Sequence, residues 1–284
     1  MFNQNIKAPV NIPVEKIHPF EGNPYKVLDN DEMNTLICSI QEQGILTPII
    51  IRPIENTDDY EVISGHRRLH ATVKAGMKEV PAFIYAVTRD EAAIMLVDSN
   101  LHREHILPSE KAFAYKLKLD ALKHQGKTSA QLGQKWSVEQ IAEESSDSRS
   151  QIQRYIRLTY LIPELLDLVD EEKIALTPAV ELSYLSDEEQ YSLLGTIEEE
   201  DRTPSLSQAV RFKKLSQAGE LSDESIETIM QEDKANQKPM FKVSMERLQK
   251  VAPKVKEKDF EDFVLKACEH YYRYLQRQRN RDAR

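Results

Sequence analysis

A cluster of basic side chains stands where an expected strand passes into an expected helix. The stretch Ser64–Ala71 reads Ser-Gly-His-Arg-Arg-Leu-His-Ala, in which Gly65 permits a tight turn and Arg67 and Arg68 follow in the first helical turn. The amides and the dipole of a helix N-terminus attract an anion, whereas cations there are unfavourable until something neutralises them. The pattern therefore indicates either a phosphate-binding site or a surface cluster of salt bridges, and the residues alone leave both open.

A second pattern, at residues 138–157, is typical of a DNA-binding helix-turn-helix. Such a motif needs two helices that cross steeply, so its contact positions must be small or apolar. These positions are Ile141, Ala142, Ile152 and Tyr155. We expect capping boxes at Ser137–Gln140 and Ser148–Gln151. Ser146 stands at the turn position that is often glycine.

The second helix of this motif has a face rich in arginine and glutamine. No acidic residue occurs between Arg149 and Glu164. Arginine and glutamine pair with guanine and adenine edges or hold phosphates. The residues predicted to contact DNA are Ser148, Arg149, Ser150, Gln151, Gln153, Arg154 and Arg157. An ordinary helical hairpin with a polar solvent face is the alternative, but the caps, the small residue and the basic face together favour DNA binding.

Four of the seven histidines lie near the basic cluster or just after the helix expected at Arg89–Leu101: His66, His70, His102 and His105. His66 and His70 are one helical turn apart, as zinc ligands can be. However, no glutamate stands where an H-E-x-x-H metal site needs its base. We therefore expect these imidazoles to line a polar pocket or to face solvent rather than to bind a transition metal.

A small α+β unit is expected to position the basic cluster. Periodicity predicts strands at Thr47–Arg52, Tyr60–Ile63 and Val80–Ala86, and helices at Asp29–Gln43, His66–Lys74 and Arg89–Leu101. The first of these helices is expected to begin with a capping box of Asp29 and Glu32 and to end at Gly44. Cys38 lies on this helix and is expected in the core.

Helical patterns fill the remaining two thirds of the chain. Helices are expected at Pro108–His124, in a run of short capped helices from Ser137 to about Tyr191, and at Leu206–Ala218, Asp223–Gln231 and Lys258–Arg279. Gly126–Gln134 reads as a polar loop, Glu198–Pro204 as an exposed boundary and Asp233–Pro239 as a linker. The predicted domains are 1–106, 107–200 for the helix-turn-helix and 201–284 for a helical C-terminal region.

Composition sets the limits of these interpretations. At about 150 residues per domain, the 284 residues suggest two domains or three smaller ones. The chain has only eight glycines, and this low number argues against an all-β fold or a Rossmann glycine loop. A net charge of −9 excludes a globally basic nucleic-acid coat but allows a local basic face. Two distant cysteines exclude a disulfide framework and indicate a reducing cytosol. No segment approaches the roughly 20 apolar residues of a membrane span, so we expect a soluble protein without a membrane partner.

The last expected helix has one apolar face. Its apolar residues are Phe260, Phe263, Val264, Ala267, Tyr271, Tyr274 and Leu275. Palindromic DNA requires a two-fold protein, so this face predicts either a homodimer interface or a helix packed on its own chain. The arginines that follow either contact DNA non-specifically or form a solvated tail.

The order of these parts resembles the ParB-type partition proteins. Gly65–Ala71 resembles that family's G-E-R-R-x-R-A box, and Ser39-Ile40 followed by Gly44–Ile49 resembles its S-I-x-x-x-G-x-x-Q-P-I stretch. Asn100–Arg103, with Pro108, Glu110 and Ala112, resembles its E-N-x-Q-R…P-x-E-E-A box. The helix-turn-helix follows at the expected distance. The resemblance covers about residues 12–195, and four ordered boxes together are highly specific.

The resemblance implies an α+β ParB-like nucleotide-binding domain, an all-α helix-turn-helix domain and a helical C-terminal region. It implies CTP as the ligand, with Mg²⁺, a palindromic DNA site, a dimer that closes into a sliding clamp, a ParA-type ATPase as partner and a cytoplasmic, nucleoid-associated protein. The implied nucleotide-binding residues are Thr47, Gly65, His66, Arg67, Arg68, Asn100 and Arg103. Of these, Gly65, Arg67 and Arg68 would hold the triphosphate and Asn100 would reach the metal.

The sequence departs from the family boxes at acidic positions. His66 replaces the box glutamate, and Ser99 replaces the acid before Asn100. His70 and His102 replace the later arginine and the glutamine. A hard cation needs oxygen ligands, so we expect weakened metal binding and slow or absent CTP hydrolysis. A sulfiredoxin-like reaction needs a thiol where His66 stands, which argues against that activity.

Two other functions compete with partition. A transcription regulator would use the same fold without segregating DNA. A nuclease of the same superfamily would need clustered carboxylates and a metal-held water, and the boxes here have lost acids rather than gained them.

Overall fold

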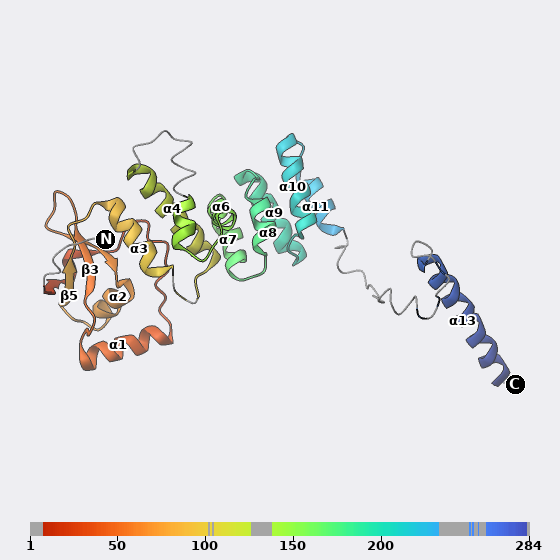
Figure 1. Cartoon of the computed structure of the whole chain (residues 1–284), viewed down its shortest axis with the longest axis horizontal. Helices are drawn as coiled ribbons and strands as arrows, with labels where there is room; N and C mark the ends of the chain where they lie inside the picture. Colours follow the sequence, from red (N-terminus) through yellow and green to blue (C-terminus); the bar gives the residue numbers. More distant parts are fainter. Residues whose placement is uncertain are drawn as a thin grey trace. The chain divides into compact units, whose positions relative to one another are not determined.

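The computed structural model describes residues 8–101, 103, 105–125, 138–232, 250, 252, 255 and 260–282. The chain divides into two compact units, residues 1–232 and 233–284, and each is described by itself (Figure 1). The division falls where the linker Asp233–Pro239 is predicted. That segment and the predicted loop Gly126–Gln134 lie outside the described residues.

The N-terminal part of unit 1 contains a five-stranded mixed sheet with the strand order β1-β5-β3-β4-β2. The strands are β1 (Val10–Pro13), β2 (Ile17–His18), β3 (Ile49–Pro53), β4 (Tyr60–Ser64) and β5 (Glu79–Ile84). β3 pairs antiparallel with β4 and parallel with β5, while β1 is antiparallel to β5 and β2 is parallel to β4. The three predicted strands are therefore present. β1 and β2 were not predicted because four and two residues are too short to display a period.

Helices cover both faces of this sheet. They are α1 (Asp31–Gln43), α2 (His66–Lys74) and α3 (Arg89–Asn100). In β4, Val62 packs with Leu69 of α2, whereas the next residue, Ile63, packs with Leu96 of α3. Successive side chains of a strand point to opposite faces, so a run of apolar residues is buried on both sides. α1 packs on α2 through Met33 and Ile40.

Two predictions about α1 are wrong. The N-cap is Asn30, whose Oδ1 accepts a hydrogen bond from the Met33 amide at 3.0 Å, so the capping box of Asp29 and Glu32 does not form. Cys38 is exposed rather than buried. Five residues after Met33, it lies about 140° around the helix from that buried side chain, on the opposite face.

The rest of unit 1 is helical. Its elements are α4 (Pro108–Gln125), a helix described over residues 138–144, α6 (Arg149–Leu158), α7 (Pro163–Asp170), α8 (Leu176–Leu182), α9 (Asp187–Glu200), α10 (Leu206–Ala218) and α11 (Asp223–Gln231). α10 packs on α8 and α11 on α9 (Figure 1). Phe212 and Ile226 join Leu165 and Leu193 in one core, so the helices after Asp201 continue the packing of those before it.

The described part of unit 2 is dominated by one helix, α13 (Phe260–Asp282), close to the predicted range Lys258–Arg279. Phe260 is buried, whereas Phe263, Tyr271, Tyr274 and Leu275 of the predicted apolar face are exposed within the single chain. No helix in the described residues has both the length and the apolar character needed to cross a membrane.

Candidate nucleotide and DNA sites

Gly65 forms the turn between β4 and α2. It is the N-cap of α2 and adopts a left-handed conformation with φ 102° and ψ 27°. A Cβ atom there would lie 2.7 Å from Cγ2 of Ile49 on the neighbouring strand β3. Both the dihedral angle and the close approach therefore require glycine.

Arg68 ties α2 to the segment that enters β3. Its Nη1 donates to the carbonyl of Pro48 at 2.8 Å and to the carbonyl of Thr47. The side chain is half-buried, and this burial lowers the pKa of Arg68 from its usual value. The structure thus brings three predicted site residues, Thr47, Gly65 and Arg68, together at the start of α2, with Arg68 bound to backbone oxygens.

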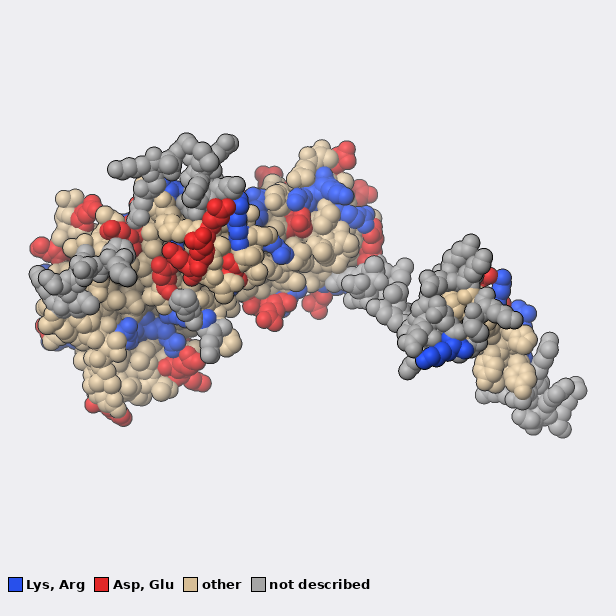
Figure 2. Space-filling view, in the orientation of Figure 1, with Lys and Arg blue, Asp and Glu red and all other residues tan. Residues whose placement is uncertain are grey.

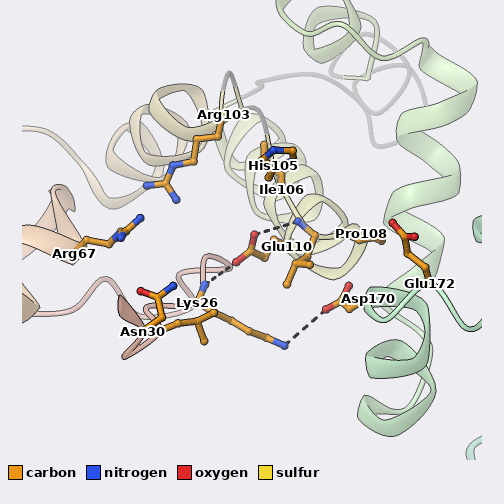
Figure 3. A pocket seen from close by; sticks show the side chains of 12 residues that line it. Lys26, Asn30, Arg67, Arg103, His105, Ile106, Pro108, Glu110, Asp170 and Glu172 are labelled. Atoms are coloured by element: carbon orange, nitrogen blue, oxygen red, sulfur yellow. Dashed lines mark hydrogen bonds and ion pairs between the residues drawn. The ribbon is translucent and has the colours of Figure 1, made fainter. Parts of the chain in front are cut away.

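Arg67 and Arg103 face one another across a cavity of about 510 Å³ (Figure 3). Arg67 comes from the first turn of α2 and forms an ion pair of 3.0 Å with Glu32 that is largely exposed to solvent. Arg103 follows α3, and its guanidinium carbon lies 5.5 Å from the centre of the Tyr25 ring. Two guanidinium groups that converge on one cavity repel each other unless an anion lies between them, so this geometry suits a phosphate. Figure 2 also shows Lys and Arg side chains gathered over the region of α2.

The opposite wall of the cavity is formed by the helical part of unit 1 (Figure 3). Glu110 of α4 accepts a hydrogen bond of 2.9 Å from the Lys26 amide. Asp170 at the end of α7 accepts one of 2.9 Å from the Ser109 amide, and its Oδ2 lies 3.7 Å from Nζ of Lys26. The cavity is therefore bounded by the predicted nucleotide domain and by the helix-turn-helix region, with cations on one side and carboxylates on the other.

His66, the first residue of α2, has a buried Nε2 atom. Burial is the main reason why its pKa falls to about 4, and the charge of Arg103 contributes. His66 is therefore neutral near pH 7. The other histidine of the box, His70, is more exposed, and its Nε2 lies 2.8 Å from Oδ1 of Asp29.

Asn100 ends α3 in a buried position, with 6% of its surface exposed. Its Nδ2 donates to the Leu96 carbonyl at 2.7 Å and to Oγ of Ser99 at 3.2 Å. Only the neutral Oδ1 of this side chain is left as an oxygen ligand for a cation. No group of three or more His, Cys, Asp or Glu in the described residues could hold a metal ion. His102, which replaces the box glutamine, lies outside the described residues.

The core positions of the helix-turn-helix are confirmed. Ile141 of the first helix and Ile152 of α6 are fully buried against Tyr115 and Leu119 of α4. Ala142 and Tyr155 pack at the edge of the same cluster. Ser148 caps α6, because its Oγ accepts a hydrogen bond from the Gln151 amide at 3.3 Å, but the Gln151 side chain does not return a bond to the Ser148 amide, so the predicted capping box forms only in part. The cap predicted at Ser137 lies outside the described residues.

The early turns of α6 present polar side chains to solvent. Ser148, Ser150 and Gln153 are exposed, and Gln151 is partly exposed. Arg149 forms an exposed ion pair of 3.0 Å with Glu139, and Nη2 of Arg154 donates to Oγ1 of Thr177 at 2.5 Å. Surface contacts of this kind contribute little to stability, so both arginines are available to exchange them for phosphate or base contacts.

Arg157 is held differently from the other predicted DNA-contacting residues. Its Nε donates to Oγ of Ser183 at 3.0 Å and its Nη2 to the Ser183 carbonyl at 2.7 Å. The guanidinium carbon also lies 4.4 Å and 4.0 Å from the ring centres of Tyr160 and Tyr184. Arg157 therefore fastens the last turn of α6 to the end of α8, a role that its position in the sequence did not reveal.

Two family models match the chain. The model described as the ParB N-terminal domain matches residues 3–101, and the ParB HTH domain matches residues 108–211. The chromosome-partitioning protein Spo0J of Thermus thermophilus is 31% identical over 202 residues, which are 71% of this chain and 70% of that protein. This chain belongs to the ParB family.

Other similar proteins carry a different name or are known as solved structures. A nucleoid occlusion protein of Listeria innocua is 31% identical over 197 residues, which cover 69% of this chain and 65% of that protein, slightly less than two thirds of its length.

Among solved structures, the truncated ParB of Caulobacter crescentus complexed to the centromeric parS site is 21% identical, and the match covers 78% of this chain and 98% of that one with a TM-score of 0.42. The same protein with CTP-γ-S is 23% identical, covering 68% and 99%, with a TM-score of 0.32. Scores this low support no inference about the contacts of this ParB-family chain.

Lys118 is a residue of this ParB-family chain that sequence reasoning missed. Its side chain is completely buried in α4, yet Nζ bonds to Oε2 of Glu144 at 2.6 Å and to the carboxylate of Asp98 on α3. It thereby joins the predicted nucleotide domain to the first helix of the helix-turn-helix. A lysine one turn after Ala114 and Tyr115, on the apolar stripe of α4, is the signal that could have identified it.

Proposed function

We propose that this ParB-family protein binds a palindromic site in double-stranded DNA and serves the partition of a plasmid, a chromosome or a mobile element. The observation that supports this most is α6, which is anchored by the buried Ile152 and presents Ser150 and Gln153 to solvent. Arg149 and Arg154 flank these residues in exposed contacts that are easily exchanged. A rigid helix with amide and guanidinium groups at its N-terminal end suits readout of a major groove.

Nucleotide binding is the second part of the proposed function, with CTP as the ligand implied by the family boxes. Arg67 and Arg103 converge on one cavity, and the Gly65 turn places the first amides of α2 beside them. α2 has no acidic residue in its first turn, so its N-terminus is unneutralised by its own side chains. Thr47, His66 and Arg68 surround the same turn. We propose that binding at this cavity, between the two halves of unit 1, closes a DNA clamp.

Magnesium fits this site poorly. His66 and Ser99 offer no carboxylate, and Asn100 offers one neutral oxygen. The nearby Asp98 is engaged by Lys118. Mg²⁺ would neutralise phosphate charge where bound, but here Arg67, Arg68 and the helix amides supply that charge. We therefore propose that the nucleotide is bound and hydrolysed slowly or not at all.

We further propose that the protein acts as a homodimer through the exposed apolar side chains of α13 and cooperates with a ParA-type ATPase. A chain truncated after Pro239 is expected to sediment as a smaller species than the full chain and to bind the palindrome more weakly. Sedimentation of the truncated chain as the same dimer would place the interface elsewhere.

The experiment that tests the DNA proposal is a genome-wide map of the DNA bound by the full chain. A few clustered palindromes are expected. Scattered promoters would instead indicate a transcription regulator, and cleavage of supercoiled DNA with Mg²⁺ or Mn²⁺ would indicate a nuclease. Gln153→Ala is expected to remove the enrichment of the palindromes, whereas Gln217→Ala, which changes another exposed glutamine on α10, should leave the map unchanged. A map unaffected by Gln153→Ala and Arg154→Ala together would contradict readout by α6.

A further inference from the structure

Among the residues that the structure describes, two buried side-chain atoms have no hydrogen-bond partner: Oη of Tyr25 and Nε2 of His66. Tyr25 lies in the loop between β2 and α1 with 6% of its surface exposed, and His66 begins α2. A buried polar group without a partner is costly, and such groups are rare in folded proteins. Two of them in one neighbourhood therefore point to a ligand that completes their hydrogen bonds.

Arg103 connects these two groups to the cavity. Its guanidinium lies over the Tyr25 ring, 5.5 Å from the ring centre, and its charge contributes to the lowered pKa of His66. The same guanidinium lines the cavity and points toward Arg67 (Figure 3). No acidic residue of the described part of the chain forms an ion pair with Arg103, although the carboxylate of Glu110 lines the same cavity.

We propose that Tyr25 and His66 are ligand-binding residues: when phosphate oxygens draw Arg103 off the Tyr25 ring, the Tyr25 O–H and the His66 Nε2–H donate hydrogen bonds to the bound polyphosphate. This assignment rests on the nucleotide binding proposed above. It adds Tyr25 to the binding residues and gives His66, already implied by the family box, the role of a neutral hydrogen-bond donor. A neutral imidazole can place its proton on Nε2, and a phenol donates without adding charge. Phosphate oxygens are acceptors only, so they match both groups.

The assignment also changes what the nucleotide needs from a metal ion. A carboxylate at position 66 would repel phosphate and would require Mg²⁺ between the two. His66 can contact phosphate directly, so the chain is expected to bind its nucleotide equally well with and without Mg²⁺.

Tyr25→Phe separates this role from a structural one. Because the hydroxyl has no partner in the free protein, its removal should leave the melting temperature unchanged or raise it. The affinity for CTP should nevertheless fall by about tenfold or more, the usual effect of losing a hydrogen bond to a charged group. Tyr85→Phe is the matched control, since Tyr85 is a partly buried tyrosine that packs against the same α3 cluster as Tyr25 but is not among the residues that line the cavity. It should change neither quantity.

The measurements are calorimetry with CTP and thermal unfolding of the full chain, each with Mg²⁺ and with EDTA. Unchanged CTP affinity in Tyr25→Phe would overturn the assignment of Tyr25, as would a melting temperature lower than that of Tyr85→Phe. His66→Glu should make CTP binding depend on Mg²⁺, whereas the wild type should bind alike in both buffers. Loss of wild-type binding in EDTA would overturn the role of His66. Failure of the wild type to bind any of the four ribonucleotides in either buffer would instead overturn the nucleotide-binding function itself.

Discussion

Replacing Gly65 with alanine tests whether the turn at the start of α2 positions the predicted phosphate site. Gly65 has φ 102°, and an added Cβ would lie 2.7 Å from Cγ2 of Ile49 and 3.1 Å from Nη2 of Arg68. Gly76, just after the other end of α2, is the matched control. It has φ 74°, but nothing lies within 4 Å of its added Cβ.

The two substitutions share one cost and differ in another. A left-handed conformation costs a residue other than glycine about 1–2 kcal/mol, which applies to both positions. Only at Gly65 must a buried strand residue move, and overpacking of this kind costs about 1–3 kcal/mol. Gly65→Ala is therefore expected to destabilise the sheet by roughly 3 kcal/mol and Gly76→Ala by roughly 1.5 kcal/mol. Displacement of Arg68 should also weaken CTP binding in Gly65→Ala alone.

Hydrogen exchange of the β3 and β4 amides reports this free energy locally, without assuming that the whole chain unfolds in one step. Amide protection factors should fall by on the order of a hundredfold in Gly65→Ala and by only about tenfold in Gly76→Ala. Equal losses in the two variants would refute the close approach of Gly65 to Ile49 as a determinant of the site.

The remaining predictions concern DNA affinity, pH and a buried charge. Arg154→Ala is expected to lower affinity for the preferred palindrome by about 1–3 kcal/mol in anisotropy titrations, and unchanged affinity would remove it from the interface. Burial lowers the pKa of His66 to about 4, so between about pH 6.5 and pH 4 this histidine is protonated in the unfolded chain but not in the folded chain. Relative to His66→Gln, the wild type should therefore lose about 3 kcal/mol of stability as pH falls from about 6.5 to about 4, and parallel curves would contradict the burial. Lys118→Met should lower the free energy of unfolding in urea by less than about 1 kcal/mol, because its two acidic partners are half-exposed. The double variant Asp98→Asn with Glu144→Gln should lower it by about 3–5 kcal/mol, because it leaves the Lys118 ammonium buried without a charged partner. The reverse order of these losses would contradict this account.

Local pattern was sufficient to predict the parts of the fold that local physics determines. β3, β4 and β5 were predicted because apolar runs between turn residues specify strands, and the turn at Gly65 because only glycine combines that conformation with a close neighbour. The core positions Ile141 and Ile152 followed from the spacing that crossed helices require. The bounds of α10 and α11 were predicted, but their packing against α8 and α9 was not.

Long-range contacts could not be predicted from the sequence. The cavity is lined by Arg67 and Arg103, which are distant in the chain. The packing of α3 on the sheet brings them to the same place. Arg157 looked like another basic residue of α6, and only the fold shows that Ser183 engages it. Cys38 was misplaced because a small apolar side chain is tolerated on either face of a helix. Tyr25 was missed because a buried hydroxyl without a partner leaves no mark in sequence.

The central claim is that α6 reads a specific DNA site. The most direct test is the ratio of affinities of the full chain for its enriched palindrome and for the same duplex with scrambled half-sites, measured at one fixed salt concentration. A specific binder is expected to prefer the palindrome by about a thousandfold or more, and Gln153→Ala should reduce that ratio. A ratio near one, at a salt concentration where both duplexes bind, would contradict sequence-specific recognition by this protein.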